Sequence, residues 1–232
     1  MAAKPKIHRA LKTEKCGEKV LLIKLGEVVR YAKGDERLKT IPSLFVKLFD
    51  DGGCLGAVNE IMPGCEWVAK GEGWATEKID GAPCAIINGV LYKRLIAHYG
   101  KPIPDNAIPC QPSPDRVTGK WPHWFPVDSR AASDRWMVRA LLHTPWVTGD
   151  GTYEAVGEHF KGNPYKLDDD FLEPHGRIRL KDCPRDYAGI REYLRTHEIE
   201  GIVWYRGNGE MCAISRRDFN YEWPVKRRSK NE

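Results

Sequence analysis

No segment of this 232-residue sequence is apolar for long enough to cross a membrane or serve as a secretory leader, because charged residues or glycines interrupt the longest apolar runs. The sequence also lacks internal repeats, Cys-x-x-Cys pairs and the histidine spacing of a zinc site. Its seven cysteines are scattered, several of them in apolar runs where Cys behaves as a small hydrophobic residue. These absences argue against a membrane protein, a disulfide framework and a zinc domain, and we expect a cytoplasmic protein.

Neither sign of charge is in large excess. The 37 Lys and Arg residues slightly outnumber the 32 Asp and Glu residues, which gives a net charge of +5. The basic residues are nevertheless clustered, at 93–94, 177–181, 216–217 and 226–230. Such clusters suit a polyanionic partner, although the last of them is more simply a solvated tail.

The length of the chain suits one well-packed domain, or at most two small ones. Apolar runs predict strands at 19–31, at 44–49 and within 66–95. Apolar residues on one face predict a helix over Ser133–His143, and a second helix is expected after an N-cap at Asp182, with Pro184 in its first turn. Mixed strands with few helices predict an α+β fold of largely antiparallel sheets enclosing a cleft.

The most informative stretch contains the tetrapeptide Lys78-Ile79-Asp80-Gly81. It follows an apolar, aromatic run and precedes a second apolar run, so Lys78 is predicted at the close of one strand, in a cleft rather than in open solvent. A lysine becomes a good nucleophile when neighbouring cations or partial burial keep its amine neutral. Asn88-Gly89 then predicts a hairpin that folds Lys93 and Arg94 back beside the Lys78 strand.

Two acids are expected beside buried strands. Glu154 lies within the apolar segment 151–157, and Glu200-Gly201 precedes a β-branched and aromatic run. A carboxylate in such a place costs free energy unless it is paired or bound to a cation. Either acid alone is more simply a satisfied charge at a strand edge, but in this order with Lys78 the two predict a Mg²⁺–ATP site.

These motifs resemble those of the covalent nucleotidyltransferases, the superfamily of polynucleotide ligases and RNA-capping enzymes. Lys-x-Asp-Gly resembles motif I, the Glu154 strand resembles motif III, and Glu200-Gly201 resembles motif IV. Further segments are similar to the family of 5′-phosphate to 3′-hydroxyl RNA ligases that has a vertebrate member, at 115–127, 162–165, 174–176, 200–204 and 223–224. The resemblance runs from about Trp74 to Pro224.

The resemblance implies an activity in three steps. Lys78 would attack the α-phosphate of ATP to form a lysyl-adenylate, the adenylate would pass to an RNA 5′-phosphate, and a 3′-hydroxyl would displace AMP. The implied cofactors are ATP and Mg²⁺ (or Mn²⁺), and the implied partner is RNA with 5′-phosphate and 3′-hydroxyl ends. Glu154 and Glu200 are the implied metal ligands. The implied ATP-binding residues are Thr76, Glu77, Lys78, Arg94, Glu154, Glu200, Ile202 and Arg217. Tyr165 and Trp204 are candidates for base stacking, with core packing as the alternative.

The implied architecture is a single nucleotidyltransferase (adenylation) domain over 1–232. It has a strand-rich part (1–65), a motif-bearing core (66–224) and a basic tail (225–232), with no C-terminal barrel domain. The absent barrel favours an RNA ligase over DNA ligases and capping enzymes. We also expect a monomer with no membrane attachment.

One departure from the superfamily pattern affects catalysis. Motif V is a Lys-x-Lys pattern that holds the ATP α-phosphate, yet Ala213 and Ser215 stand where its lysines are expected. Three explanations stay open: Arg216 and Arg217 have taken over, the sequence was altered to trap one step, or the protein is a weak or inactive relative. Alternation along a continuing strand would place Arg217, rather than Arg216, on the face of Ala213 and Ser215.

Two alternatives to an ATP-dependent RNA ligase follow from these motifs. One is a capping-type nucleotidyltransferase that uses GTP. The other is a catalytically inactive protein that binds nucleotides or RNA ends. Covalent labelling by ATP separates the ATP-dependent ligase from both alternatives.

Overall fold

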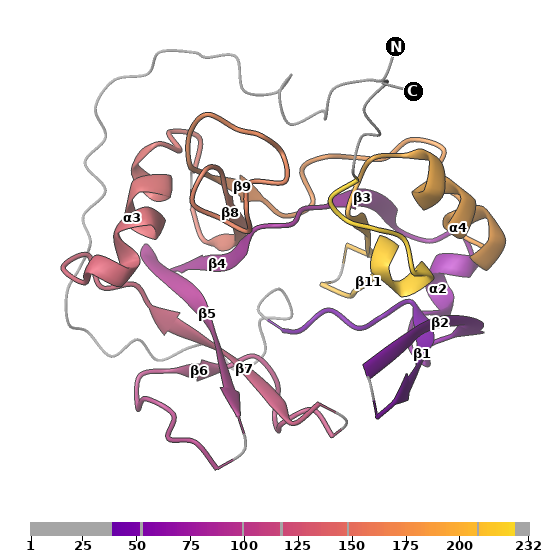
Figure 1. Cartoon of the computed structure of the whole chain (residues 1–232), viewed down its shortest axis with the longest axis horizontal. Helices are drawn as coiled ribbons and strands as arrows, with labels where there is room; N and C mark the ends of the chain where they lie inside the picture. Colours follow the sequence, from indigo (N-terminus) through magenta and orange to yellow (C-terminus); the bar gives the residue numbers. More distant parts are fainter. Residues whose placement is uncertain are drawn as a thin grey trace, which may run out of the picture. The chain divides into compact units, whose positions relative to one another are not determined.

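The computed structural model describes residues 39–225 except 52, 99, 117, 148 and 208. The strand predicted at 19–31, Cys16 and the basic cluster at 226–230 lie outside these residues. The described chain divides into two compact units (Figure 1). Ile41–Ile79 and residues 176–225 form the first unit, and Asp80–His175 with residues 39–40 form the second. The expected single nucleotidyltransferase domain stays a prediction.

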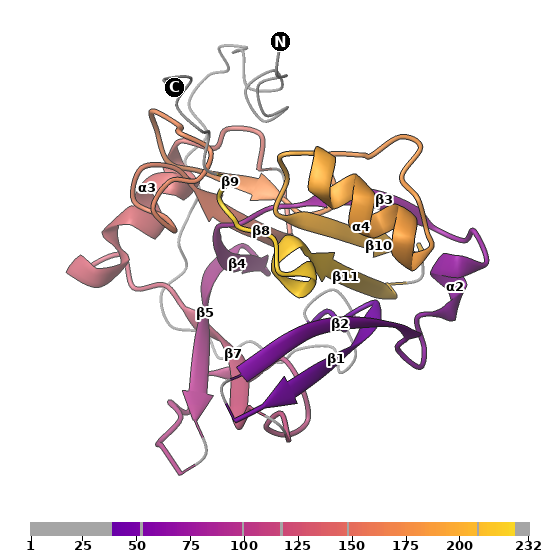
Figure 2. The same cartoon turned by 45° about the vertical axis from the view of Figure 1, so that its right-hand side comes forward.

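The first unit is built on a three-stranded sheet of order β11-β10-β3. Its strands are antiparallel: β3 (Trp74–Lys78), β10 (Gly201–Tyr205) and β11 (Met211–Ser215). Helix α4 (Tyr187–Thr196) covers one face of this sheet, as Figure 2 shows. Buried Ile190 and Leu194 of α4 pack in one core with Ile202, Trp204 and Ile214 of the sheet.

Smaller elements complete this unit. They are the antiparallel pair β1 (Phe45–Asp50) and β2 (Gly53–Ile61), the short helix α2 (Glu66–Ala69) and the 3-10 helix η3 (Arg216–Phe219). The segment around Ser43 adds to the edge of β11 by a parallel bridge to Ala213. The run predicted as a strand at 44–49 is thus confirmed as β1.

The second unit holds a six-stranded sheet of order β6-β7-β5-β4-β8-β9. Its strands are β4 (Ala82–Ile87), β5 (Val90–His98), β6 (Ile108–Pro109), β7 (Lys120–Pro126), β8 (Gly151–Val156) and β9 (Phe171–Pro174). All of their pairings are antiparallel. The 3-10 helix η2 (Ala132–Asp134) leads into α3 (Arg135–Leu142), which packs on one face of the sheet. The predicted α+β class with largely antiparallel sheets is confirmed.

The hairpin predicted at Asn88-Gly89 is confirmed. Asn88 and Gly89 both have positive φ, 51° and 76°, as a two-residue turn between twisted strands requires. The Asp150 carboxylate accepts hydrogen bonds from the N–H groups of both residues, at 2.6 and 3.1 Å. The pairing partner was predicted wrongly, however, because β5 pairs with β4 and β7, whereas the Lys78 strand pairs with β10.

Of the two predicted helices, the first is confirmed as α3. The second begins later than predicted: Asp186, rather than Asp182, is the N-cap of α4 and accepts a hydrogen bond from the Gly189 N–H at 2.9 Å. Asp182 has a positive φ of 53° and lies in a turn that precedes the helix. Within the described part of the chain, no helix has both the length and the apolar character that a membrane crossing requires.

Candidate functional site

Lys78 and Glu200 form an ion pair in the first unit. The Lys78 Nζ atom lies 2.6 Å from Oε2 and 2.8 Å from Oε1 of Glu200. The pair exists because β3 and β10 are in register with Lys78 opposite Gly201, so the residue before Gly201 reaches the lysine. Lys78 keeps 31% of its side chain exposed and Glu200 only 11%. The amine is therefore held in place by an ion pair on a side chain that stays partly exposed.

The sheet places Ser215 in line with Lys78. Gly201 lies opposite Lys78 on β3 and opposite Ser215 on β11, so the Lys78 and Ser215 side chains share a face with only a glycine between them. A Cβ atom on Gly201 would lie 2.3 Å from the Ile214 carbonyl oxygen, so a larger residue does not fit. The next row joins Thr76, Val203 and Ala213, and the Thr76 hydroxyl donates to the Val203 carbonyl oxygen at 3.1 Å.

Two predicted ATP-binding residues point to the other face of this sheet. Glu77 lies opposite Ile202 in the register, one residue out of phase with Lys78. The Ile202 side chain is fully buried in the core under α4, and Glu77 is also buried. The structure therefore does not bring these two side chains to the face of Lys78.

The face of Lys78 also carries aromatic side chains that sequence reasoning did not select. Trp74 precedes Lys78 by four residues on β3, and its ring lies 6.1 Å from that of Tyr205, with 15° between the planes. The Arg179 guanidinium lies 4.2 Å from the Trp74 ring. Strict alternation along the strand was the signal for Trp74, but the partner strand of Tyr205 could not be read locally.

The two arginines after β11 differ from the prediction. The strand ends at Ser215, and Arg216–Phe219 forms η3, so alternation does not extend to Arg217. Arg216 is buried and donates to the carbonyl oxygens of Leu194, His197 and Glu222. Arg217 is exposed, with its guanidinium 3.4 Å from the Trp223 carbonyl oxygen. The Arg216 guanidinium is thus used in hydrogen bonds to the backbone. The prediction that alternation along the strand places Arg217 beside Ser215 was wrong.

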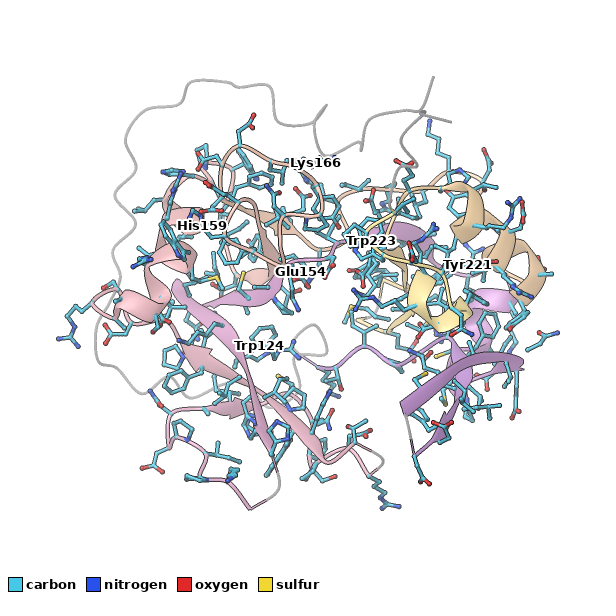
Figure 3. The ribbon with its side chains drawn as sticks, in the orientation of Figure 1. Trp124, Glu154, His159, Lys166, Tyr221 and Trp223 are labelled. Carbon is cyan, nitrogen blue, oxygen red and sulfur yellow. The ribbon has the colours of Figure 1, made fainter. Side chains whose placement is uncertain are left out.

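Glu154, in the second unit, is a buried carboxylate with one unsatisfied oxygen (Figure 3). Its Oε1 atom lies 3.1 Å from the His175 Nε2 atom, whereas Oε2 has no hydrogen-bond partner in the described structure. Glu154 also lies directly opposite the fully buried Glu173 on β9. Like charges at such a position are destabilising unless other groups compensate. Glu173 was missed because its strand is short and the family-like segment begins only after it, at Pro174.

Arg94 lies on the same face of the second sheet as Glu154. In the pairing of β4 with β5, Cys84 is opposite Lys93, so the next residue, Arg94, continues the register opposite Pro83. Pro83 is also opposite Glu154 on β8, so Arg94, Pro83 and Glu154 lie in one row across the sheet. Its Nε atom is buried without a hydrogen-bond partner among the described residues, and its guanidinium lies 4.0 Å from the Trp124 ring.

The surroundings of Arg94 have opposing effects on the pKa of its guanidinium. Burial lowers the pKa of the Arg94 guanidinium, and the nearby Cys110 and Glu154 oppose that shift. Lys93 faces the other way and pairs with Asp134, so the two predicted cations do not act together.

The fit of this second unit to a divalent cation is partial. A carboxylate oxygen is a ligand that Mg²⁺ prefers, and Glu154 Oε2 is such an atom without a partner. No group of three or more potential metal ligands occurs among the described residues. Mg²⁺ commonly binds through one or two carboxylates together with substrate phosphates and water, so Glu154 fits one place in such a shell. Because Glu200 belongs to the first unit, a cation shared by both acids stays a prediction.

The glycine of the Lys-x-Asp-Gly motif has a steric role. A Cβ atom on Gly81 would lie 2.5 Å from the Ala155 carbonyl oxygen and 2.9 Å from the Glu154 Cβ atom. The N–H of the preceding Asp80 donates to the Tyr165 hydroxyl oxygen at 2.7 Å. Gly81, which belongs to the second unit, is therefore packed directly against the Glu154 strand. Buried Tyr165 acts here as a hydrogen-bond partner, and fully buried Trp204 belongs to the core, so neither is a stacking surface.

Gly81→Ala is expected to destabilise the protein by about 1–3 kcal/mol, because the added methyl group must displace β8. Thermal unfolding measures the loss. Gly149→Ala is the matched control, since a Cβ atom there meets nothing within 4 Å. Equal unfolding midpoints for the two variants would contradict the packing role of Gly81.

These features define a class of protein. The chain is an α+β protein of antiparallel sheets, with an accessible lysine–glutamate pair on one sheet and a buried glutamate near an arginine on the other. Such charged sets are candidates for binding a phosphorylated ligand and a cation.

Comparison with known proteins makes the class specific. The model of the family RNA ligase 1 matches residues 140–232. RNA ligase 1 of Rattus norvegicus is 28% identical over 223 residues, which covers 65% of this chain and 68% of that protein, and the Mus musculus protein gives the same values. RNA ligase 1 of Danio rerio is 31% identical over 83 residues, or 32% of this chain and 26% of that protein. The chain is therefore related to the RNA ligases, and the predicted relationship is confirmed.

Proposed function

We propose that this protein is an ATP-dependent RNA ligase that joins a 5′-phosphate to a 3′-hydroxyl through a lysyl-adenylate on Lys78. The relationship to RNA ligase 1 supports the ligase class. The observation that carries the mechanism is the Lys78 amine, which is held at 2.6 and 2.8 Å by Glu200 and is partly exposed. A lysine that is fixed in direction and partly exposed suits attack on a bound phosphate once its amine has lost a proton.

The first step forms a bond between the Lys78 Nζ atom and the α-phosphorus of ATP, and the bond to pyrophosphate breaks. The amine must lose a proton in this step, and Glu200 is the acceptor in contact with it. RNA 5′-phosphate oxygen then displaces Lys78 from the adenylate, which regenerates the amine. In the last step the 3′-hydroxyl attacks the activated 5′-phosphorus and AMP leaves.

We assign roles to other residues from what their atoms can donate or accept. The unsatisfied Glu154 Oε2 atom is proposed to coordinate a divalent cation or to accept a hydrogen bond from a ribose hydroxyl. Arg94 is proposed to donate its buried Nε–H to ribose or phosphate. Mg²⁺ or Mn²⁺ would neutralise the triphosphate and align pyrophosphate for departure. Thr76 and Glu77 are proposed to recognise adenine, Glu77 through its backbone because its side chain faces α4's side of the sheet. We further propose a monomeric, cytoplasmic protein.

The two alternatives are separated by one labelling experiment. The protein is mixed with Mg²⁺ and either α-labelled ATP or α-labelled GTP, and label that survives denaturation is measured. Label from ATP alone supports the ligase, and label from GTP alone would favour a capping-type enzyme. No label from either nucleotide, with retained nucleotide or RNA binding, would favour an inactive relative.

RNA is the expected substrate. We expect a nicked all-RNA duplex with a 5′-phosphate to be sealed at least about tenfold faster than an all-DNA nick of the same sequence, because the relatives are RNA ligases and a protein distinguishes RNA from DNA through the 2′-hydroxyl and A-form shape. Initial rates at one fixed salt concentration measure this, since phosphate contacts make binding depend steeply on salt. Equal rates on both nicks would overturn the preference.

A further inference from the structure

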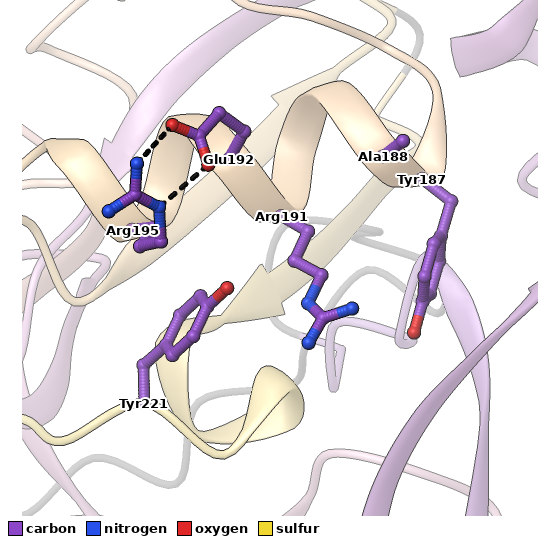
Figure 4. A pocket seen from close by; sticks show the side chains of 6 residues that line it. All are labelled: Tyr187, Ala188, Arg191, Glu192, Arg195 and Tyr221. Atoms are coloured by element: carbon purple, nitrogen blue, oxygen red, sulfur yellow. Dashed lines mark hydrogen bonds and ion pairs between the residues drawn. The ribbon is translucent and has the colours of Figure 1, made fainter.

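A cavity of about 390 Å³ lies on the outer side of α4, in the first unit (Figure 4). It is lined by the exposed side of the helix and by Tyr221, which follows η3. The lining residues are Tyr187, Ala188, Arg191, Glu192, Arg195 and Tyr221. Ala188 is the only one of these residues that is neither aromatic nor charged.

The charges in this cavity are not balanced. Glu192 binds Arg195 through two contacts, at 2.6 and 2.7 Å, so these two charges compensate each other. Arg191 has no ion pair or hydrogen bond within the described residues, and Figure 4 shows its guanidinium directed between Tyr187 and Tyr221. One uncompensated guanidinium thus projects between two aromatic rings.

The position of the cavity separates it from Lys78. Ile190 and Leu194 of α4 face the sheet and are fully buried, whereas the other lining positions of the helix, Ala188, Arg191, Glu192 and Arg195, are exposed. Tyr187, in the first turn, packs at the edge of the core, and its hydroxyl donates to the Ala57 carbonyl oxygen at 2.7 Å. The Ile202 side chain lies on the face under α4, and Ile202 pairs with Glu77 in the register. Lys78 is the next residue along β3, so its side chain points to the other face of the sheet. A helix about 10 Å across packed on a sheet puts the cavity on the order of 20 Å from the Lys78 amine.

We infer that this cavity binds single-stranded RNA, with a phosphate on Arg191 and a base against Tyr221, at a distance from the ends being joined. The inference rests on the proposed RNA ligase function. A planar guanidinium is suited to a phosphate, and a tyrosine ring such as that of Tyr221, which keeps part of its surface exposed, can stack on a base whatever the sequence. The RNA must pass around the sheet, so at about 3.4 Å per stacked nucleotide the site contacts RNA at least about six nucleotides from the join.

Substrate length therefore provides the test. Binding of 5′-phosphorylated single-stranded RNA of about 6 and about 20 nucleotides is measured by fluorescence anisotropy at several salt concentrations. Arg191→Ala is expected to weaken binding of the longer RNA about fivefold or more and to reduce the magnitude of its salt slope by about one. Binding of the shorter RNA and covalent AMP labelling are expected to stay unchanged.

Matched variants define the remaining outcomes. Arg130→Ala removes the same charge from an exposed side chain of the second unit, and it should leave binding of both RNAs unchanged. Tyr221→Leu should weaken binding of the longer RNA, and Tyr221→Phe should not, with thermal unfolding as the check on folding. Unchanged binding of the longer RNA by Arg191→Ala, or an equal loss for both RNAs, would overturn the site. Absence of AMP labelling in the parent protein would count against the proposed ligase and leave this binding test valid.

Discussion

Lys78→Ala is expected to abolish covalent labelling by ATP and to lower RNA sealing by more than about 10³-fold, because the nucleophile of the first step is lost. Intact-mass analysis after incubation with ATP and Mg²⁺ should show one added AMP in the parent protein and none in the variant. The effect should be one of chemistry rather than folding. However, truncation leaves the Glu200 carboxylate, only 11% exposed, without its ion-pair partner.

Lys78→Arg separates chemistry from stability. Arginine can keep the ion pair with Glu200 but stays protonated, so it cannot serve as the nucleophile. We expect this variant to unfold close to the parent midpoint and to take up no AMP. Lys181→Ala, at an exposed position, controls for loss of one positive charge and should label normally. Any AMP attached to Lys78→Ala would show that another residue carries the adenylate.

Features encoded by neighbouring residues were predictable from the sequence. The turn at Asn88-Gly89 was recognisable because both residues tolerate positive φ, and both adopt it. Helix α3 followed from its apolar spacing, since Met137, Ala140 and Leu141 are buried on one side. The end of strand β3 at Lys78 and the strand β8 around Glu154 were likewise predictable, because each apolar run is bounded by glycine.

Features that depend on distant pairing were not predictable. The neighbour of β3 is β10, more than a hundred residues away, and no local pattern distinguishes it from β5. The same limit hid the Glu154–Glu173 pair, which exists only because β8 and β9 are adjacent. Local signals also compete: both Asp182 and Asp186 can cap a helix, and packing of Ile190 and Leu194 fixes where α4 begins.

Prediction of single site residues failed where a strand ended unexpectedly. Alternation would have carried Arg217 to the face of Ser215, but Ser215 instead caps η3. Its side chain accepts from the Asp218 backbone N–H, while the Asp218 carboxylate accepts from the Ser215 N–H at 2.8 Å. This reciprocal capping ends β11 and turns the chain away, which favours the interpretation that no arginine has replaced the motif V lysines.

Installing both lysines, Ala213→Lys with Ser215→Lys, is therefore expected to raise the rate of lysyl-adenylate formation on the order of a hundredfold or more. Loss of one preorganised cation at a developing negative charge typically costs that much. The register supports a direct effect at position 215, because Ser215, Gly201 and Lys78 lie in one row. Two strand spacings separate the Ser215 and Lys78 backbones by about 10 Å, which two lysine side chains can bridge to one phosphate.

The two positions should contribute unequally. Ser215 is partly exposed, whereas Ala213 is only 9% exposed. The side chain of a lysine at position 213 therefore has to extend out of a nearly buried position to reach a phosphate. We expect Ser215→Lys alone to supply most of the gain, at a loss of about 1 kcal/mol in stability because its side chain no longer caps η3. Labelling rate and thermal unfolding of the single and double variants measure both effects.

The control for Ser215→Lys is Ser215→Gln, which adds a long polar side chain without a positive charge. A gain in the lysine variant and none in the glutamine variant would show that the parent protein lacks a cationic clamp on the α-phosphate. No gain in either, combined with loss of labelling in Arg217→Ala, would show that the exposed Arg217 already holds the phosphate despite lying beyond the end of β11. Because η3 directs the chain away after Ser215, and Arg217 contacts the Trp223 carbonyl oxygen, we expect the first result.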